Sequence, residues 1–410
     1  MKSAALVPFL LMSAMAAGPG SAGTVPKGKP EDAGMSPERL RRIHEAIQRH
    51  IDAGEISGAV TLVARRGRIV HFEAHGLMDI ENQRPMQTDA IFRLASMTKP
   101  ITGTAVMMML EEGKLRLNDP VSKYLPEFKN PHVAVAHGNP GEFYVVPADR
   151  ELTIRDLLTH TNGLMTGGIG SKSGPPRPVE GDTLATYVPK LGAVPLDFQP
   201  GTQWAYSGLA GPDTLSRIVE IVSDQPYDQF LRTRLFEPLG MHDTFFYPPE
   251  DRRPRLTTLY SKSPHGLVKA PNQNGFSMQS YFSGSGLMST AEDYLQFAEM
   301  LLNGGEMNGM RFLSPRTVDL MSANHVGDMF NGKLGRPAHG MGYGLLVGIV
   351  EDNVAAGLRV SNGSFGWDGA YGTQTWIDPK EKMVTIVMIQ TQVVSVQRDF
   401  ENAVMQAIVE

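Results

Sequence analysis

A serine and a lysine three residues apart, Ser96 and Lys99 in the segment LASMTKPITG, could together perform nucleophilic chemistry. Positions i and i+3 share one face of a helix, so the two side chains would lie within reach of each other if this segment opens a helix. A serine hydroxyl becomes a useful nucleophile when a neighbouring group takes its proton, and the unpaired N–H groups at a helix start favour a developing negative charge. The spacing alone leaves a second interpretation open, in which Ser96 only caps the helix and Lys99 is solvated.

Two later segments add candidates for the same chemistry. Residues 200–208 read PGTQWAYSG and contain Tyr206, which by itself could equally be a buried aromatic residue beside Trp204. Residues 366–373 read GWDGAYGT and precede a predicted strand. Taken in order with Ser96-x-x-Lys99, these segments resemble the superfamily of serine β-lactamases, D-alanyl-D-alanine peptidases and β-lactamase-like carboxylesterases. Its members carry Ser-x-x-Lys, then Tyr-x-Asn, then a Lys-Thr-Gly-like triplet on a sheet strand.

The resemblance extends to further stretches in the same order. These are LLTHTNG at 157–163, PLGMHDT at 238–244 and STAEDY at 289–294, so the similar region runs from about residue 35 to residue 410. The resemblance implies a β-lactamase/transpeptidase-like α/β (α+β) fold, in which an antiparallel sheet built from both chain ends is flanked by helices and accompanied by a mostly helical subdomain.

The resemblance also implies roles for individual residues. Ser96 would be the acylated nucleophile, and Lys99 with Tyr206 would be the pair that takes its proton and later activates water. The oxyanion hole would consist of the backbone N–H groups of Ser96 and Ala370. Two such preorganised donors stabilise a tetrahedral transition state by several kcal/mol.

Two departures from the family pattern bear on the substrate. Gly208 stands where the Tyr-x-Asn motif has asparagine, and Trp367 stands where the third triplet opens with lysine. A neutral indole cannot replace a cation that faces a substrate carboxylate. We therefore expect an uncharged site with Trp367, Gly369, Tyr371 and Gly208 as substrate-binding residues, although Trp367 could also be a packing residue only.

The run Trp-x-Gly-Ala-Tyr-Gly-Thr from position 367 is most similar to the family VIII carboxylesterases. The resemblance thus implies a serine carboxylesterase that hydrolyses small neutral esters through an acyl-enzyme on Ser96. The alternatives are a β-lactamase or D-alanyl-D-alanine carboxypeptidase, an acyl transferase, and a non-catalytic sensor or binding protein that resembles the penicillin-binding proteins. The sequence does not distinguish the natural substrate, the acyl-chain length or the oligomeric state.

Composition excludes several other classes. The 410 residues are 41% hydrophobic and 20% charged, which is typical of a globular chain, and the net charge of −5 is unlike that of a nucleic-acid-binding domain. With no cysteine there is no disulfide and no thiolate metal site. We expect no cofactor, no metal and no nucleic-acid partner.

The first residues favour export. Lys2 precedes an apolar run and an Ala14-Met15-Ala16 pattern, which is typical of a secretory signal covering 1–23. The run is shorter than the ~20 residues that cross a bilayer, so we expect a periplasmic or secreted protein with no stable membrane insertion. A linker would follow at 24–35.

Periodicity predicts the elements that must position these residues. We expect one catalytic unit, 36–410, in which 36–95 and 285–410 form an α/β subdomain and 96–284 a mostly helical one. The predicted helices are 37–53, 102–114, 154–159, 211–223, 226–236, 291–303 and 396–409. The predicted strands are 58–63 and 69–74, joined as a hairpin, and then 343–350, 355–361, 373–377 and 383–389. Residues 129–150 are expected to be turn-rich.

Three further patterns are not assigned to the chemistry. His71, Glu73 and His75 suggest a metal site, but on a strand the two histidines would stand about 13 Å apart, and His44-Glu45 lacks a second histidine at the zincin spacing. His160 is expected to bond loop backbone rather than act as a base. Gly284-Ser285-Gly286 lacks the strand and helix of a nucleophile elbow, which leaves a Ser-His-Asp triad unsupported.

Overall fold

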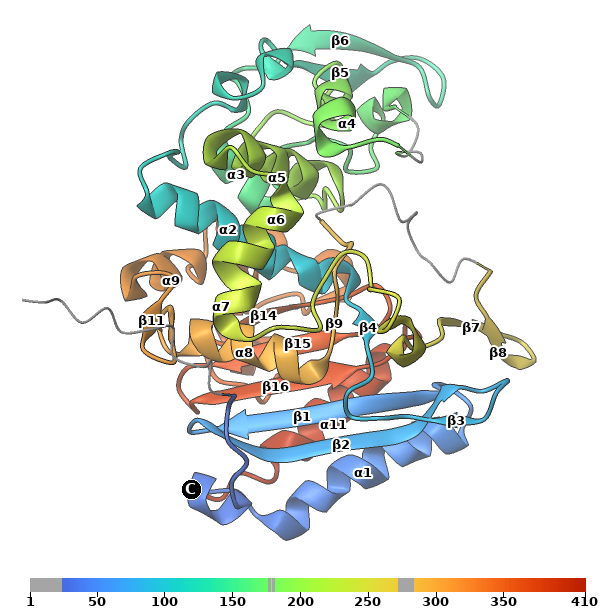
Figure 1. Ribbon diagram of the computed structural model, residues 1–410. Coiled ribbons are helices and arrows are strands. Elements are labelled where there is room, and N and C mark those ends of the chain that lie inside the picture. Colours follow the sequence, from blue (N-terminus) through green and yellow to red (C-terminus); the bar gives the residue numbers. More distant parts are fainter. Residues whose placement is uncertain (1–23, 176–177, 179–180, 272–283) are drawn as a thin grey trace, which may run out of the picture.

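The computed structural model describes residues 24–175, 178, 181–271 and 284–410, so the predicted signal segment 1–23 lies outside the described residues. Its centre is an antiparallel sheet of eight strands within the described residues (Figure 1). In spatial order the strands are β12 (Met341–Tyr343), β13 (Gly348–Val350), β14 (Phe365–Asp368), β15 (Gln374–Asp378), β16 (Met383–Met388), β1 (Gly58–Arg65), β2 (Arg68–Asp79) and β3 (Arg84–Pro85). The predicted fold class is confirmed.

The two ends of the chain meet inside this sheet. β1 pairs with β16 from Val60↔Met388 to Arg65↔Met383, and every residue of both strands is buried. β1 and β2 form the predicted hairpin, whose turn places Arg66 and Gly67 at positive φ. Strands with both faces covered read as continuous apolar runs, which is the pattern seen here.

Helices cover both faces of the sheet. α1 (Pro37–Asp52) and α11 (Val394–Met405) lie on one face, and α2 (Thr98–Glu111) and α8 (Ala291–Leu302) lie on the other (Figure 1). Ser36 accepts a hydrogen bond from the Arg39 N–H at the start of α1, and Thr290 caps α8 in the same way. These caps satisfy donors that a helix start leaves unpaired.

A mostly helical part extends from the α2 face. It contains α3 (Ile154–Thr159), α4 (Leu184–Leu191), α5 (Ala210–Ser223), α6 (Tyr227–Leu231), a π-helical turn (Arg232–Phe236) and α7 (Glu237–Leu239). Two further α-helices are α9 (Pro315–Met321) and α10 (Asn353–Ala356). Outside the main sheet, the described strands form pairs: β4 (Phe92–Arg93) with β9 (Met288–Ser289), β5 (His132–Ala136) with β6 (Phe143–Pro147), β7 (Tyr260–Ser263) with β8 (Gly266–Lys269), and β10 (Glu306–Met307) with β11 (Met310–Arg311).

Three predictions about local structure were wrong. The single strand at 343–350 is two strands, β12 and β13, because the chain reverses at 344–347. The strand at 355–361 is α10 and a loop, since Asp352 caps a helical turn there. The segment 366–373 does precede a strand, β15, although its first residues belong to β14. The turn-rich segment 129–150 contains the β5–β6 hairpin, whose long polar connection hides the pattern.

The sheet separates two clusters of buried side chains. Val60 and Leu62 of β1 pack toward α2 and α8, whereas Ala59 and Val63 pack toward α1 and α11. Alternate residues of a strand point to opposite faces, so one strand contributes to both clusters. Residues 24–35, predicted to be a linker, lie against β2, where the Gly28 N–H donates to the Ile69 carbonyl. Among the described helices, none combines the length and the apolar character needed to span a bilayer.

Candidate active site

The structure brings Ser96 and Lys99 together at the start of α2. Ser96 lies in a short 3-10 turn (Ala95–Met97) that leads into the helix, and it provides no capping bond. The Lys99 side chain is fully buried, and its Nζ donates to the Ser96 Oγ at 3.0 Å. These positions contradict the alternative in which the serine caps the helix and the lysine is solvated.

A second partner of Lys99 comes from a distant segment. The Nζ also donates to the Gly284 carbonyl at 2.8 Å, and the Gly284 N–H donates to Asp213 Oδ1 at 3.1 Å. The two bonds orient the ammonium toward Ser96. Sequence reasoning missed Gly284, since no local pattern signals a carbonyl 185 residues from the lysine that it binds.

Tyr206 lies beside the buried lysine. Lys99 Nζ is 4.9 Å from the centre of the phenol ring, and the Trp367 indole N–H donates to the Tyr206 hydroxyl at 3.3 Å. Ser96 and Tyr206 are both partly exposed, whereas Lys99 is fully buried. A hydroxyl, an amine and a phenol from two separate segments thus share one site.

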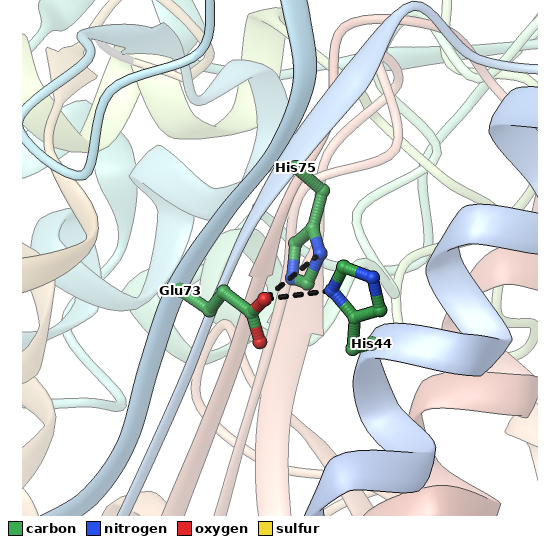
Figure 2. Close-up of side chains that lie close together, drawn as sticks. All are labelled: His44, Glu73 and His75. Atoms are coloured by element: carbon green, nitrogen blue, oxygen red, sulfur yellow. Dashed lines mark hydrogen bonds and ion pairs between the residues drawn. The ribbon is translucent and has the colours of Figure 1, made fainter.

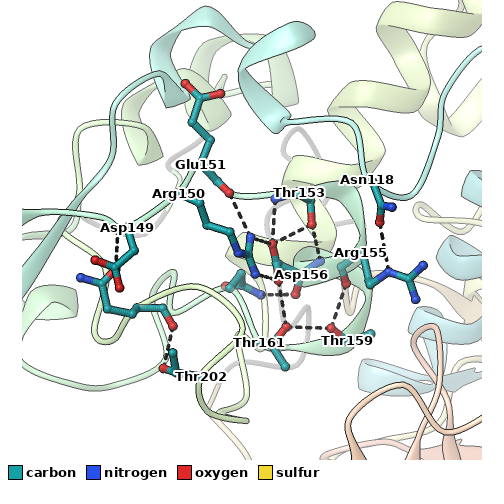
Figure 3. Close-up of polar contacts among 12 residues, drawn as sticks. Asn118, Asp149, Arg150, Glu151, Thr153, Arg155, Asp156, Thr159, Thr161 and Thr202 are labelled. Atoms are coloured by element: carbon teal, nitrogen blue, oxygen red, sulfur yellow. Dashed lines mark hydrogen bonds and ion pairs between the residues drawn. The ribbon is translucent and has the colours of Figure 1, made fainter.

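The loop that carries Tyr206 is held by a polar network around Asp156 (Figure 3). Asp156 forms a two-point ion pair with Arg150, at 2.6 and 2.8 Å, and completes a capping box with Thr153 at the start of α3. Asp156 also accepts a hydrogen bond from the Thr161 hydroxyl. The backbone carbonyl of Thr161 in turn accepts one from the Gly201 N–H. Through Gly201, the network holds the segment that leads to Tyr206.

His160 packs directly behind Tyr206. The two ring centres are 4.7 Å apart, and His160 is fully buried with no partner in the described residues for either ring nitrogen. Its backbone carbonyl accepts from Ala205, but the prediction that its side chain bonds loop backbone was wrong. Burial, and then the charge of Lys99, holds the pKa of His160 well below its usual range, so the ring is neutral.

The turn after β14 packs against the backbone segment that leads to Ser96. The Thr373 hydroxyl donates to the Leu94 carbonyl at 3.0 Å, and a Cβ on Gly369 would come within 2.2 Å of the same oxygen. Among the described residues, no acceptor pairs with the backbone N–H of Ser96 or of Ala370. Two unpaired donors on adjoining segments are what an oxyanion hole requires.

Of the four expected substrate-binding residues, two are partly exposed and two are buried. Gly208 and Tyr371 are partly exposed beside the exposed Ala370, and Gly369 is buried in the turn. Trp367 is 2% exposed, and the rings of Tyr343, Tyr206 and Phe330 pack against its indole. The indole therefore positions the phenol, a role that its bulk and its N–H allow.

A cation that the sequence did not signal lies near Trp367. The Arg336 guanidinium carbon is 5.2 Å from the indole centre, and its side chain forms an ion pair with Asp368. The Asp368 carboxylate is thereby engaged by the Arg336 guanidinium, and it compensates the positive charge of Arg336 at the side of β14.

Comparisons with known proteins agree with this geometry. The profile of the Beta-lactamase family matches residues 43–409. Protein Rv1367c of Mycobacterium tuberculosis is 37% identical over 84% of this chain and 88% of its own length, and Esterase EstB of Burkholderia gladioli is 30% identical over 85% and 90%. The solved structure of EstCE1, described as a hydrolase with promiscuous acyltransferase activity, superposes with a TM-score of 0.76 at 28% identity and covers 90% of this chain and 99% of its own.

The fold and the site define a serine hydrolase of the β-lactamase type. The chain belongs to the Beta-lactamase family.

Proposed function

We propose that this protein is a carboxylesterase that hydrolyses small neutral esters through an acyl-enzyme on Ser96. The observation that carries the proposal is the fully buried Lys99, whose Nζ is held between the Gly284 carbonyl and the Ser96 hydroxyl, with Tyr206 beside it. Burying a lysine is costly unless its charge has partners. Here the partners include the hydroxyl that would react.

In the proposed reaction Ser96 Oγ attacks the ester carbonyl while the Lys99/Tyr206 pair takes its proton. The tetrahedral oxyanion is stabilised by the N–H groups of Ser96 and Ala370. The C–O bond to the leaving alcohol then breaks, and the pair returns the proton to that alcohol. Water, activated by the same pair, adds to the acyl-enzyme and releases the carboxylic acid and free Ser96.

The residues at 366–373 favour neutral esters over β-lactams as substrates. Where β-lactamases and peptidases present a lysine to a substrate carboxylate, this chain has an indole that bonds Tyr206, and the nearby Arg336 is paired with Asp368. Gly208 likewise offers no side-chain amide to an acyl-amide substrate. Esterase EstB, which is similar over most of the chain, is an esterase by its name and supports an ester as the substrate.

The test compares two chromogenic substrates on the same preparation. We expect a p-nitrophenyl ester with a short acyl chain to be turned over with a kcat/KM far above that of a chromogenic cephalosporin. A decisive preference for the cephalosporin would overturn the proposed substrate class. A graded series of acyl lengths would then define the acyl pocket.

Acyl transfer is a second candidate, because EstCE1 combines hydrolysis with promiscuous acyltransferase activity. Both reactions share the first half and differ in whether water or an alcohol accepts the acyl group. Product analysis with a primary alcohol present measures the partition, and ester formation exceeding hydrolysis in dilute alcohol would reassign the protein as a transferase.

A non-catalytic binding protein is distinguished by mass spectrometry. We expect a phosphonate inhibitor to add one adduct, located on Ser96. Absence of any adduct, together with absence of turnover, would favour the binding protein. We also propose export, which the intact and processed masses of the protein in cell fractions would test.

A further inference from the structure

Three potential metal ligands meet on the sheet face opposite Ser96 (Figure 2). His44 projects from α1, and Glu73 and His75 project from β2. His44 Nδ1 is 2.7 Å from Glu73 Oε1, His75 Nδ1 is 3.9 Å from the same oxygen, and all three ligand atoms lie within 4.8 Å of one another. The set combines two imidazoles and a carboxylate, which is a donor set that Zn²⁺ accepts.

The expectation that strand geometry keeps the β2 histidines apart was wrong for their side chains. The hydroxyl of Thr61, on the neighbouring strand β1, lies 2.8 Å from His71 Nε2 and 2.9 Å from His75 Nε2. Both rings therefore lean toward one point between them. The third ligand, His44, comes from a helix that the sequence pattern of β2 cannot reveal.

The contacts of Thr61 constrain the His75 tautomer. A hydroxyl has one proton to donate, so it can donate to only one of the two rings and must accept an N–H from the other. When His75 is the ring that donates its Nε2–H to Thr61, its Nδ1 carries a lone pair. Metal-bound histidines are commonly held in this way by an acceptor at the other ring nitrogen.

His75 Nδ1 is a buried polar atom without a partner. The residue is 2% exposed, and no described group forms a hydrogen bond with this nitrogen, although it is directed toward Glu73 and His44. Buried polar atoms are satisfied in the large majority of cases, so an orphaned one requires an explanation.

We propose that His44 Nδ1, the Glu73 carboxylate and His75 Nδ1 bind one divalent transition-metal ion, with Zn²⁺ as the fitting example. Ligand atoms on tetrahedral zinc are about 3.3 Å apart, so Glu73 and His44 must separate slightly and His44 must approach His75. The side chains of His44 and Glu73 are 53% and 38% exposed and are free to adjust, whereas His75 is fixed by Thr61.

The surroundings leave room for a fourth ligand. A hollow of about 460 Å³ adjoins His44 and Glu73 between α1 and β2, and it is open to solvent. Water can therefore complete the coordination. Because the ion would join α1 to β2 on the far side of the sheet from Ser96, it stabilises the fold and takes no part in ester hydrolysis.

Calorimetric titration of the metal-stripped full chain with Zn²⁺, without a histidine affinity tag, tests the proposal. We expect one ion per chain and an affinity at least about 10-fold weaker in His44→Ala and in Glu73→Gln. His265→Ala, at an exposed position in the β7–β8 turn, is the matched control and should bind as the unmodified chain does. Because His44 and Glu73 are exposed, these variants fold even if His75 variants do not.

Two further readouts complete the experiment. Saturation with Zn²⁺ at about 100 times the dissociation constant should raise the melting temperature of the chain by about 3 °C, and Co²⁺ should give the visible absorption of a four-coordinate site. Absence of saturable binding, or equal affinities in His44→Ala, Glu73→Gln and His265→Ala, would overturn the proposal. The esterase rate should be the same in all three variants, which keeps this test separate from that of the proposed function.

Discussion

His160 and His75 are both buried histidines, and they lie in different parts of the fold: His160 follows α3, and His75 lies on β2. His160 is surrounded by aromatic rings, including Tyr206 and Trp204, and among the described residues neither of its ring nitrogens has a hydrogen-bond partner. One nitrogen of His75 is bonded to Thr61, and the other faces a carboxylate and a second imidazole. Both rings are buried, but only that of His75 is presented to other potential ligands.

The comparison shows that burial alone does not define a functional group. Whether a buried imidazole only packs or can bind a ligand depends on the groups that face its free nitrogen lone pair. The same holds for Lys99, whose burial is meaningful because Ser96 lies at the end of its side chain. The following changes test whether the two regions have the separate roles assigned here.

The largest effect is expected from Ser96→Ala. Removing the nucleophile should lower kcat for a p-nitrophenyl ester by about 10⁴-fold or more, while Zn²⁺ affinity on the other face stays unchanged. Steady-state kinetics and calorimetry on one preparation check both. Ser322→Ala, at the end of α9, is the control for a serine deletion away from the site. Near-normal turnover in Ser96→Ala would remove the assigned nucleophile.

Tyr206→Phe should have the next largest effect. It removes the hydroxyl of the proton-transfer pair and keeps the ring against His160, so kcat should fall by about 10²- to 10⁴-fold. In Lys99→Met, kcat should fall by a factor in the same range, because this substitution removes the buried amine. Single-turnover kinetics measure the acylation step directly. If Tyr206→Phe acylates at a normal rate, the phenol is not the base.

Trp367→Phe is expected to cost about 3- to 10-fold in kcat with little change in KM, because one hydrogen bond of about 1 kcal/mol to Tyr206 is lost. Trp376→Phe is the matched control, since this second buried indole also lies near Arg336 but has no described contact with Tyr206. A change in KM alone would instead mean that Trp367 contacts the substrate. The split between kcat and KM therefore separates positioning from binding.

The smallest effect concerns the pH dependence of stability. The pKa of folded His160 is lowered, so its contribution is fully present above the unfolded pKa of about 6.5 and is lost as the pH falls toward the folded value. His160→Phe keeps the ring packing and removes this term, which is at most about 1.4 kcal/mol per pH unit. Denaturant titrations at pH 7.5 and pH 5 should show a shallower loss of stability in the variant. An unchanged difference between the two pH values would mean that folded His160 is protonated.

The sequence by itself determined what is local or periodic. The spacing of Ser96 and Lys99 placed both on one helix face, Ser36 and Thr290 marked helix starts, and the apolar runs of β1, β2, β15 and β16 predicted strands. These features follow from backbone geometry within a few residues. The order of the three motifs then indicated the family and, through it, the fold.

Only the tertiary structure decided which distant groups face one another. Gly284 binds Lys99, Trp367 binds Tyr206 from beneath, and Arg336 reaches the indole, each across a separation that no periodicity encodes. Near α1, the Thr61 hydroxyl contacts both His71 and His75, and His44 approaches from α1. Such contacts depend on how helices and strands pack, and packing is set by the whole chain rather than by any segment of it.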